Sequence, residues 1–359
     1  MSKIYIFSDV SYVGYKHINH FLADSFAKSG SDVVFIDRVV LNWPTMKRLT
    51  SAVVQKFNKK KFKKALKDNG ENYSKVGKPT IKKAFNLPPG NRCVNFLTRF
   101  LLRNIMKDIC PEDKVIIFAP HPFLKELFYS NDVIYYCVHD SSKQKYSESV
   151  RFLEKELLKI SKLNFFDNND VASRLVGLDT ENYPATLSGS KNIVIPSPVP
   201  SEFFENYNSK IKYDYVYFGS IHENIDIDVI KKLVDEGNRI LIISSDFLDM
   251  KSNNITIIPA IYDIELLART ISESEIILFP YKNSTFMDTV TPAKLFQSLA
   301  TGKKIVCSNT NLCQRYDFLI PFESRFNQSD LLMAHDYIDK ISCLNTNNVC
   351  DFVLSKLYE

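Results

Sequence analysis

Hydrophobic positions in the first half of the chain alternate between two patterns. Helical periodicity, with apolar residues three and four apart, marks residues 15–29, which end at Gly30, and residues 147–161. Between such stretches lie short apolar runs of the kind that fill a parallel sheet, at 3–7, 33–36, 114–118, 133–138, 163–166 and 193–195. Alternation of strands and helices predicts a β/α unit with a parallel sheet.

The same alternation starts again in the second half. Helices are expected at 226–236 and 263–272, and strands at 213–218, 239–244, 255–258, 275–279 and 304–307. A proline cluster at 196–200 is typical of a hinge between domains. We therefore predict an α/β protein with two Rossmann-like β/α/β domains facing a cleft, at 1–200 and 201–335, followed by a helical tail at 336–359.

Composition narrows the class of protein. The chain has 359 residues, of which 45% are hydrophobic and 24% charged, as in ordinary globular proteins. Its seven cysteines form no C-x-x-C pair, so reduced thiols are expected and a zinc site or disulfide framework is not. A strand directly after the N-terminus and the lack of an apolar run of about 18 residues predict a cytoplasmic protein without signal peptide or membrane span.

Charge is unevenly distributed along the chain. The net charge of +5 conceals a basic insertion at about 45–107, in which residues 47–107 hold 17 lysines and arginines but two acids, Asp68 and Glu71. The rest of the chain holds 29 basic and 39 acidic residues. An asymmetry of this size indicates a binding partner of negative charge.

Apolar residues interleave with these cations. Phe57 and Phe62 lie among the lysines, and Phe96 and Phe100 lie beside Arg99. Interleaved cationic and apolar residues favour the surface of an anionic membrane. Nucleic acid binding and a solvated, flexible insertion are the competing interpretations. We expect segment 47–107 to bind an anionic membrane surface and expect no nucleic acid partner.

The most informative motif lies between the last predicted strands. Thr291 suits a helix N-cap, Pro292 suits the first turn, and Gly302 suits the C-terminal end about two and a half turns later. Lys294 falls in the first turn, where free N–H groups favour an anion, and Gln297 shares its face. The pattern predicts a site for a diphosphate with a sugar attached.

These residues also carry a resemblance. The pattern Pro-x-Lys-x-x-Glu-x-Leu-Ala-x-Gly, after a strand ending in Phe-Pro, is similar to the nucleotide-sugar site of GT-B glycosyltransferases of the group 1 type. Those bacterial enzymes build capsule, O-antigen and teichuronic-type polysaccharides. Gln297 departs from the pattern, because the family carries a glutamate that holds the ribose hydroxyls. The matching positions are Pro292, Lys294, Leu299, Ala300 and Gly302.

The resemblance implies an activity and a division of labour. It implies a hexosyltransferase that moves a sugar from a nucleotide diphosphate sugar, expected to be a UDP-sugar, to a hydroxyl of a lipid-linked surface polysaccharide intermediate. The first domain would bind the acceptor, the second would bind the donor, and the last helix would cross back to the first domain. No metal or other cofactor is expected, since Lys294 and helix N–H groups would stabilise the departing diphosphate. The enzyme would work on the inner face of the cell membrane.

Other candidate donor residues follow strands of the second half. Gly219 would let the backbone approach a ligand, and Ser220 and His222 could then bind phosphate. Tyr281 and Lys282 begin a loop that closes over the sugar and phosphates in the family. That loop ends near Thr289, which replaces the first acid of the Glu-x7-Glu pair of many retaining relatives.

Candidate catalytic and acceptor residues follow strands of the first half. Asp140 and His139 end an apolar run, and a carboxylate there suits a general base that deprotonates the acceptor hydroxyl, with His139 as second choice. Asp140 could instead cap the following turn. Asp9 and His121 follow two other strands and are candidate acceptor contacts, although Asp9 could simply cap a turn.

Two alternatives remain open on the same fold. One is a nucleotide-sugar 2-epimerase, which would not need a basic amphipathic insertion. The other is a non-catalytic, transferase-like binding subunit. This alternative stays open because Gln297 and Thr289 replace both acids of the family.

Overall fold

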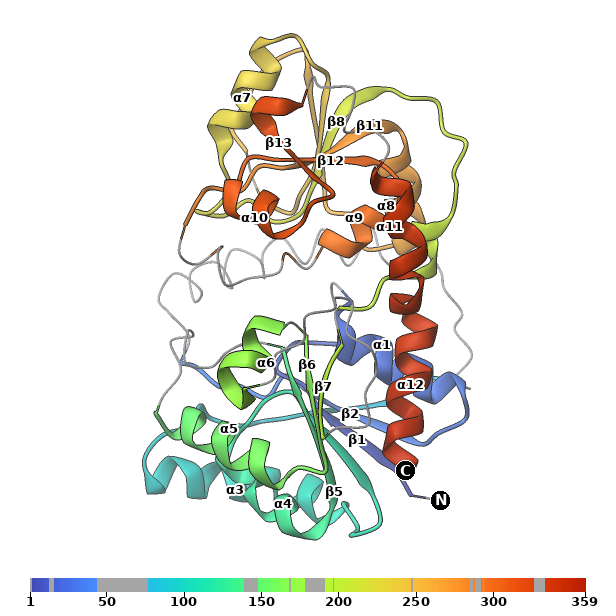
Figure 1. Cartoon of the computed structure of the whole chain (residues 1–359). Coiled ribbons are helices and arrows are strands. Elements are labelled where there is room, and N and C mark those ends of the chain that lie inside the picture. The colour runs from blue at the N-terminus through green and yellow to red at the C-terminus, as the bar shows by residue number, and fades with distance from the viewer. Residues whose placement is uncertain are drawn as a thin grey trace, which may run out of the picture. The chain divides into compact units, whose positions relative to one another are not determined.

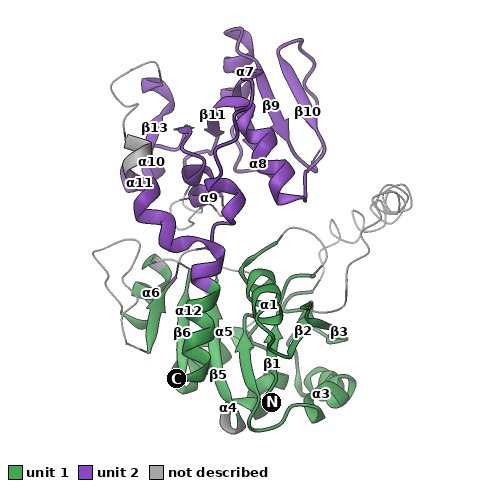
Figure 2. Ribbon diagram, turned by 90° about the vertical axis from the view of Figure 1, so that its right-hand side faces the viewer, with its two compact units in different colours: residues 1–181, 187–194, 350–359 green, residues 182–186, 195–349 purple. Residues whose placement is uncertain are grey.

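The computed structural model describes residues 2–12, 16–43, 77–138, 148–167, 169–177, 191–195, 197–246, 248–284, 287, 292, 294–325 and 333–359. The chain forms two compact units, coloured separately in Figure 2. Unit 1 comprises Met1–Glu181, Leu187–Val194 and Cys350–Glu359, and unit 2 comprises Asn182–Thr186 and Ile195–Val349.

Unit 1 is built on a seven-stranded parallel sheet of order β3-β2-β1-β4-β5-β6-β7 (Figure 1). The strands predicted for this unit are present. The edge strand β3 was not predicted, because its largely exposed Thr-Ile-Lys-Lys lacks a buried pattern. The strands are β1 (Ile4–Phe7), β2 (Val33–Asp37), β3 (Thr80–Lys83), β4 (Lys114–Ile117), β5 (Asp132–Cys137), β6 (Leu163–Phe166) and β7 (Asn192–Val194).

The helices of unit 1 connect these strands. They are α1 (Ile18–Lys28), α3 (Arg92–Lys107), η1 (Pro122–Glu126), α4 (Leu127–Ser130), α5 (Glu148–Ile160) and α6 (Asn169–Val176). The last helix, α12 (Thr346–Tyr358), adds its final turns to unit 1, where the Phe352 ring meets Phe165 of β6 with centroids 6.4 Å apart. The predicted return of the C-terminal helix to the first unit is therefore confirmed.

Unit 2 repeats the architecture with a six-stranded parallel sheet of order β10-β9-β8-β11-β12-β13. Its strands are β8 (Tyr213–Phe218), β9 (Ile240–Ile243), β10 (Ile255–Ile258), β11 (Ser274–Phe279), β12 (Lys304–Cys307) and β13 (Leu319–Pro321). The helices are η2 (Ser201–Phe204), α7 (Ile227–Asp235), α8 (Ile264–Ser272), α9 (Leu295–Ala300), α10 (Thr310–Arg315), η4 (Phe322–Ser324), α11 (Met333–Ile341) and η6 (Ser342–Leu344).

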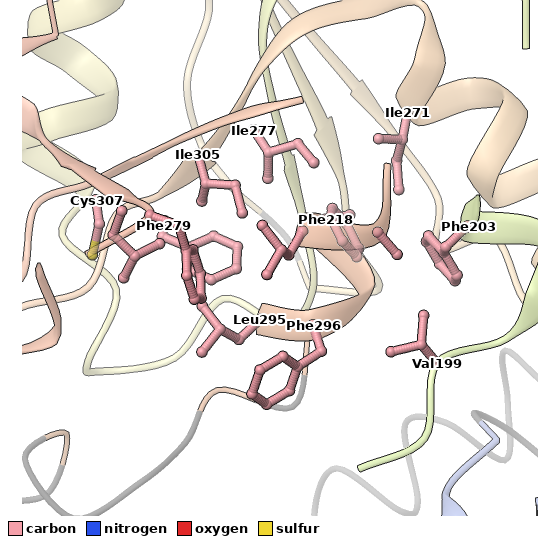
Figure 3. Close-up of a cluster of buried hydrophobic side chains, with 14 of the residues drawn as sticks. Val199, Phe203, Phe218, Ile271, Ile277, Phe279, Leu295, Phe296, Ile305 and Cys307 are labelled. Carbon is pink, nitrogen blue, oxygen red and sulfur yellow. The ribbon is translucent and has the colours of Figure 1, made fainter. Parts of the chain in front are cut away.

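Alternate residues of each strand in unit 2 pack on opposite faces of the sheet. Tyr215 and Tyr217 of β8 join the core under α7, whereas Phe218 joins the core under α8 and α9. Figure 3 shows this second core, to which Leu295 and Phe296 of α9 both belong. Full burial of a side chain such as Leu295 contributes about 2 kcal/mol, so the core holds α9 in place beneath the loops described next.

Candidate functional site

The centre of the site is the backbone immediately after β8. Gly219 has φ of +148°, a conformation that side chains disfavour. A Cβ built there would lie 2.5 Å from Lys294 Nζ and 3.2 Å from the Tyr217 hydroxyl. Glycine is therefore required twice at this position, once by the backbone and once by the lysine that lies against it.

Lys294 reaches this glycine from the start of α9. Its Nζ donates to the Phe218 carbonyl at 2.7 Å and lies 5.0 Å from the centroid of the Phe218 ring. Burial lowers the pKa of Lys294 to about 8. The ammonium is therefore largely protonated at neutral pH although part of its hydration is lost. A cation in such a low-dielectric position interacts strongly with an added anion.

The helix after Lys294 is shorter than the sequence predicts. It begins at Leu295, and Lys294 occupies the N-cap position instead of the first turn. The amide of Leu295 donates to the Pro292 carbonyl at 2.9 Å, which makes a single turn ahead of the helix. The C-terminal end is as predicted, because Gly302 has φ of +69°. Attraction of an anion therefore depends on the charge of Lys294 more than on the dipole of this six-residue helix. Gln297 lies on the same helix and is partly buried.

The loop after Gly219 is tied to neighbouring strand ends. The Tyr217 hydroxyl donates to the Ser220 carbonyl at 2.6 Å, and the Ile221 amide donates to Asp246 Oδ2 at 2.8 Å. His222 is exposed, and its Nδ1 accepts from the Asn224 amide at 3.3 Å. Tyr217 was not predicted, because its place in an apolar run is typical of a core residue. Asp246 was not predicted either, although it follows β9 and the rule that ligands bind at strand ends could have found it.

Tyr281 and Lys282 follow β11 and differ in role. The Tyr281 ring packs edge-on against Phe279 with centroids 5.6 Å apart, and burial raises the pKa of its hydroxyl well above the ordinary value of 10.0. The main role of Tyr281 is therefore to pack against the core. Lys282 is exposed, while its carbonyl accepts from Asn309 Nδ2 at 2.7 Å and its amide donates to the Asn224 carbonyl at 2.9 Å. Its backbone is thus fixed while its charge faces solvent.

Unit 2 therefore gathers polar groups at the carboxyl ends of β8, β9, β11 and β12. One cation is desolvated and held above a glycine, a second is exposed, and the loops between them are joined by hydrogen bonds. This arrangement suits a dianionic group that approaches the backbone closely, as a diphosphate does.

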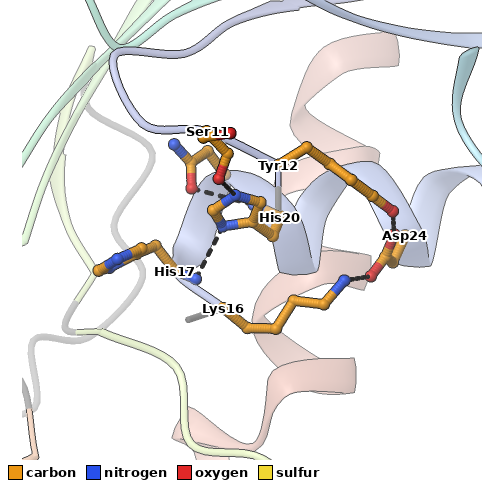
Figure 4. A network of polar contacts seen from close by, with 7 residues as sticks. Ser11, Tyr12, Lys16, His17, His20 and Asp24 are labelled. Atoms are coloured by element: carbon orange, nitrogen blue, oxygen red, sulfur yellow. Dashed lines mark hydrogen bonds and ion pairs between the residues drawn. The ribbon is translucent and has the colours of Figure 1, made fainter. Parts of the chain in front are cut away.

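The loop after β1 in unit 1 is held by a second polar network (Figure 4). His20 is fully buried, its Nδ1 accepts from the His17 amide at 2.9 Å, and its Nε2 donates to the Ser11 carbonyl at 2.9 Å. Burial lowers the pKa of His20 to about 4, so the ring is neutral. Tyr12 and Lys16 both bind Asp24, which fixes the far side of the loop.

Asp9 lies within this loop and is partly buried. It follows β1 by two residues, at the carboxyl end of the sheet where ligands bind in such folds. Its neighbour Ser8 accepts a hydrogen bond from Asn19 Nδ2 of α1 at 2.7 Å. The structure thus holds Asp9 at the predicted sheet edge, and its contact with an acceptor stays a prediction.

His121 has a structural position. Its ring is fully buried, its Nδ1 accepts from the Phe123 amide at 3.4 Å and caps η1, and its Nε2 donates to the Leu87 carbonyl at 2.8 Å. Burial lowers the pKa of His121 to about 4. Both nitrogens are engaged inside the protein, so the expected role in lining an acceptor site has no support, and the ring instead joins two loops of unit 1.

Four predicted site residues, His139, Asp140, Thr289 and Thr291, lie outside the described residues. Their roles stay predictions. β5 ends at Cys137, so the chain places Asp140 three residues beyond a strand end of unit 1.

Within the described residues, no group of three or more His, Cys, Asp or Glu side chains is arranged to hold a metal ion. No helix in the same part of the chain is long and apolar enough to cross a membrane.

The two parallel-sheet units define the class of fold, which is the GT-B fold of glycosyltransferases. No protein-family model matches the sequence, and no curated protein matches it either. Solved structures do match.

Three similar structures illustrate the match. WaaG, a glycosyltransferase involved in lipopolysaccharide biosynthesis, is 11% identical with a TM-score of 0.58, over 97% of this chain and 99% of its own. A UDP-forming α,α-trehalose-phosphate synthase from Burkholderia xenovorans in complex with glucose-6-phosphate is 10% identical with a TM-score of 0.61, over 99% and 100%. A trehalose-6-phosphate protein from E. coli bound with UDP-2-fluoro glucose is 11% identical with a TM-score of 0.54, over 99% of each chain. At such identities the likeness establishes the fold alone.

Proposed function

We propose that this protein is a glycosyltransferase that moves a hexose from a nucleotide diphosphate sugar to a hydroxyl group. One observation carries the proposal. The desolvated ammonium of Lys294 lies against the carboxyl end of β8, where only Gly219 leaves room for it. Similar structures include one bound with UDP-2-fluoro glucose, which supports a UDP-sugar as donor.

Charge on the leaving diphosphate would be stabilised by side chains. Lys294 supplies a partly dehydrated cation, which interacts with a phosphate more strongly than a fully hydrated one does. The side chain of Lys282 is exposed and would move onto the outer phosphate. The backbone of Gly219 and Ser220 would contact the phosphates. The side chain of Gln297 would bind the ribose hydroxyls. In this scheme no metal ion or other cofactor takes part.

The acceptor is proposed to be a lipid-linked intermediate of a bacterial surface polysaccharide, such as capsule or O-antigen. The similarity to WaaG, which is involved in lipopolysaccharide biosynthesis, supports this class, as does the basic segment 47–107 suited to an anionic membrane surface. Asp140 would act as general base on the acceptor hydroxyl, with His139 as the second candidate for that role, and Asp9 would contact the acceptor. The protein would act at the inner face of the cell membrane.

Replacing Lys294 tests the donor site. We expect Lys294→Ala to abolish the thermal shift caused by UDP, GDP or TDP sugars and to abolish donor hydrolysis, because the cation facing the diphosphate is gone. Lys210→Ala is the matched control, since Lys210 is an exposed lysine three residues before β8, at the opposite end of that strand. Loss of one charge-assisted contact lowers affinity by about tenfold or more.

The outcomes separate the alternatives. Unchanged binding in Lys294→Ala would overturn the site. Binding of a sugar nucleotide without hydrolysis or transfer would indicate a non-catalytic binding subunit, and turnover of free sugar nucleotide to its C2 epimer would indicate an epimerase. An Asp140→Asn variant that keeps full transfer would remove Asp140 from the mechanism.

A further inference from the structure

Helix α3 of unit 1 buries very little of its surface. Of its sixteen residues, Thr98 and Leu102 are buried, and these two lie one turn apart on one face. Thr98 Oγ1 accepts from the Leu87 amide at 3.2 Å, which attaches this face to the loop after β3. The helix is therefore docked along a narrow line, and the wider part of its surface faces outward.

The outward surface of α3 is apolar to an unusual degree. Phe96 is 73% exposed and Phe100 is 64% exposed, one turn apart, and Leu97 and Leu101 form a second exposed pair beside them. Phe85, two residues before Leu87, is 70% exposed as well. Single exposed apolar side chains are common, whereas a row of four on one helix marks an interaction surface. We call Phe96, Leu97, Phe100 and Leu101 the α3 apolar row.

The same helix is uniformly cationic. It contains no acid, and Arg99, Arg103 and Lys107 follow one another at four-residue spacing beside the apolar row, with Arg92 about two turns before Arg99. Arg99 also approaches Glu126 at 3.3 Å, with both side chains largely exposed. Aromatic and leucine side chains beside a row of cations form the surface of a helix that lies in a lipid headgroup region.

We infer that α3 lies flat on an anionic bilayer, with the α3 apolar row inserted at the boundary of headgroups and acyl chains and the cations on lipid phosphates. The helix is about 24 Å long at 1.5 Å per residue, so it can contact several lipids. The inference deepens the membrane association within the proposed function, but it does not depend on donor binding or catalysis.

Charge distinguishes this occupant from others. Residues 44–76 of the same chain hold ten basic residues and two acids, so covering the cationic α3 with that segment would bring like charges together. Nucleic acid would pair with the cations but would leave the leucines of the apolar row without a partner. An anionic lipid surface satisfies both the cations and the apolar row.

Vesicle flotation of the full chain tests the inference. With vesicles of phosphatidylcholine containing about 30 mol% phosphatidylglycerol at low salt, we expect binding that falls as salt rises and is weak on pure phosphatidylcholine. Phe96→Ser with Phe100→Ser should lower vesicle affinity about tenfold or more. Phe152→Ser is the matched control, because Phe152 of α5 is 60% exposed in the same unit, and this variant should bind like the parent.

Further measurements show whether lipid, the protein itself or a second copy covers the α3 apolar row. Arg103→Gln with Lys107→Gln should weaken binding and flatten its salt dependence. Vesicle binding by the double phenylalanine variant equal to that of the parent would overturn the inference, as would equal binding of the parent to neutral vesicles. A lower unfolding midpoint of that variant would show that the protein covers the row itself, and loss of a dimer would show that a second copy does. UDP-sugar thermal shifts should be the same in all variants, so failure here is distinct from failure of the donor site.

Discussion

At the scale of single residues, the site depends on a match between one glycine and one lysine. Gly219 adopts a backbone conformation that suits glycine, and the space a side chain would take is occupied by Lys294 Nζ. The two residues are 75 positions apart, so their contact is a product of the fold. The motif around Lys294 predicted that this lysine binds an anionic ligand. The structure adds that Gly219 leaves the space in which the lysine side chain lies.

We predict that Gly219→Ala impairs both nucleotide binding and stability, with a cost of about 1–3 kcal/mol from backbone strain and from displacing Lys294. Gly237→Ala is the matched control, because Gly237 has φ of +89° but open space where its Cβ would lie. Thermal shifts with UDP and urea unfolding measure the two effects. A Gly219→Ala variant that unfolds and binds UDP like Gly237→Ala would show that the contact with Lys294 is unimportant.

Two buried histidines predict a dependence of stability on pH. Burial lowers the pKa of both His20 and His121 from 6.5 to about 4. Between these values the unfolded chain binds the protons, so the free energy of unfolding falls as pH drops from about 6.5 toward 4, by at most about 3 kcal/mol for each ring. His121→Asn keeps a side chain able to cap η1 and should reduce this slope in urea unfolding between pH 7 and pH 5. An unchanged slope would contradict the assignment.

At the scale of elements, tertiary contacts shortened one helix and exposed another. α9 begins at Leu295 because the turn from Pro292 to Leu295 precedes it and Lys294 is turned toward the Phe218 carbonyl. α3 was part of a segment identified by its charge, but the alignment of its aromatic and leucine residues on an outward face became visible only when the buried pair Thr98 and Leu102 was known.

We predict that Leu295→Ala destabilises unit 2 by about 2–5 kcal/mol, because Leu295 is fully buried in the core that supports α9. Urea unfolding measures the change, and weaker UDP binding should accompany it since Lys294 is the preceding residue. Leu266→Ala on α8, where Leu266 is 54% exposed, should cost less than about 0.5 kcal/mol. Equal costs in the two variants would mean that α9 is not held by this core.

At the scale of the whole molecule, the hydrophobic pattern by itself determined the parallel sheets, the order of strands and helices along the chain, and a helical tail. The return of that tail to unit 1 was expected from the resemblance alone, and tertiary contacts such as that of Phe352 with Phe165 decide it. Apolar runs and helical periods are local properties, so they can be read from neighbouring residues. The edge strand β3, the burial of His121, the tie from Tyr217 to Ser220 and the pairing of Gly219 with Lys294 were decided by tertiary structure. Each depends on residues that are distant in the chain or on the burial of a polar group, and such contacts exist only once the sheet has brought its strand ends together.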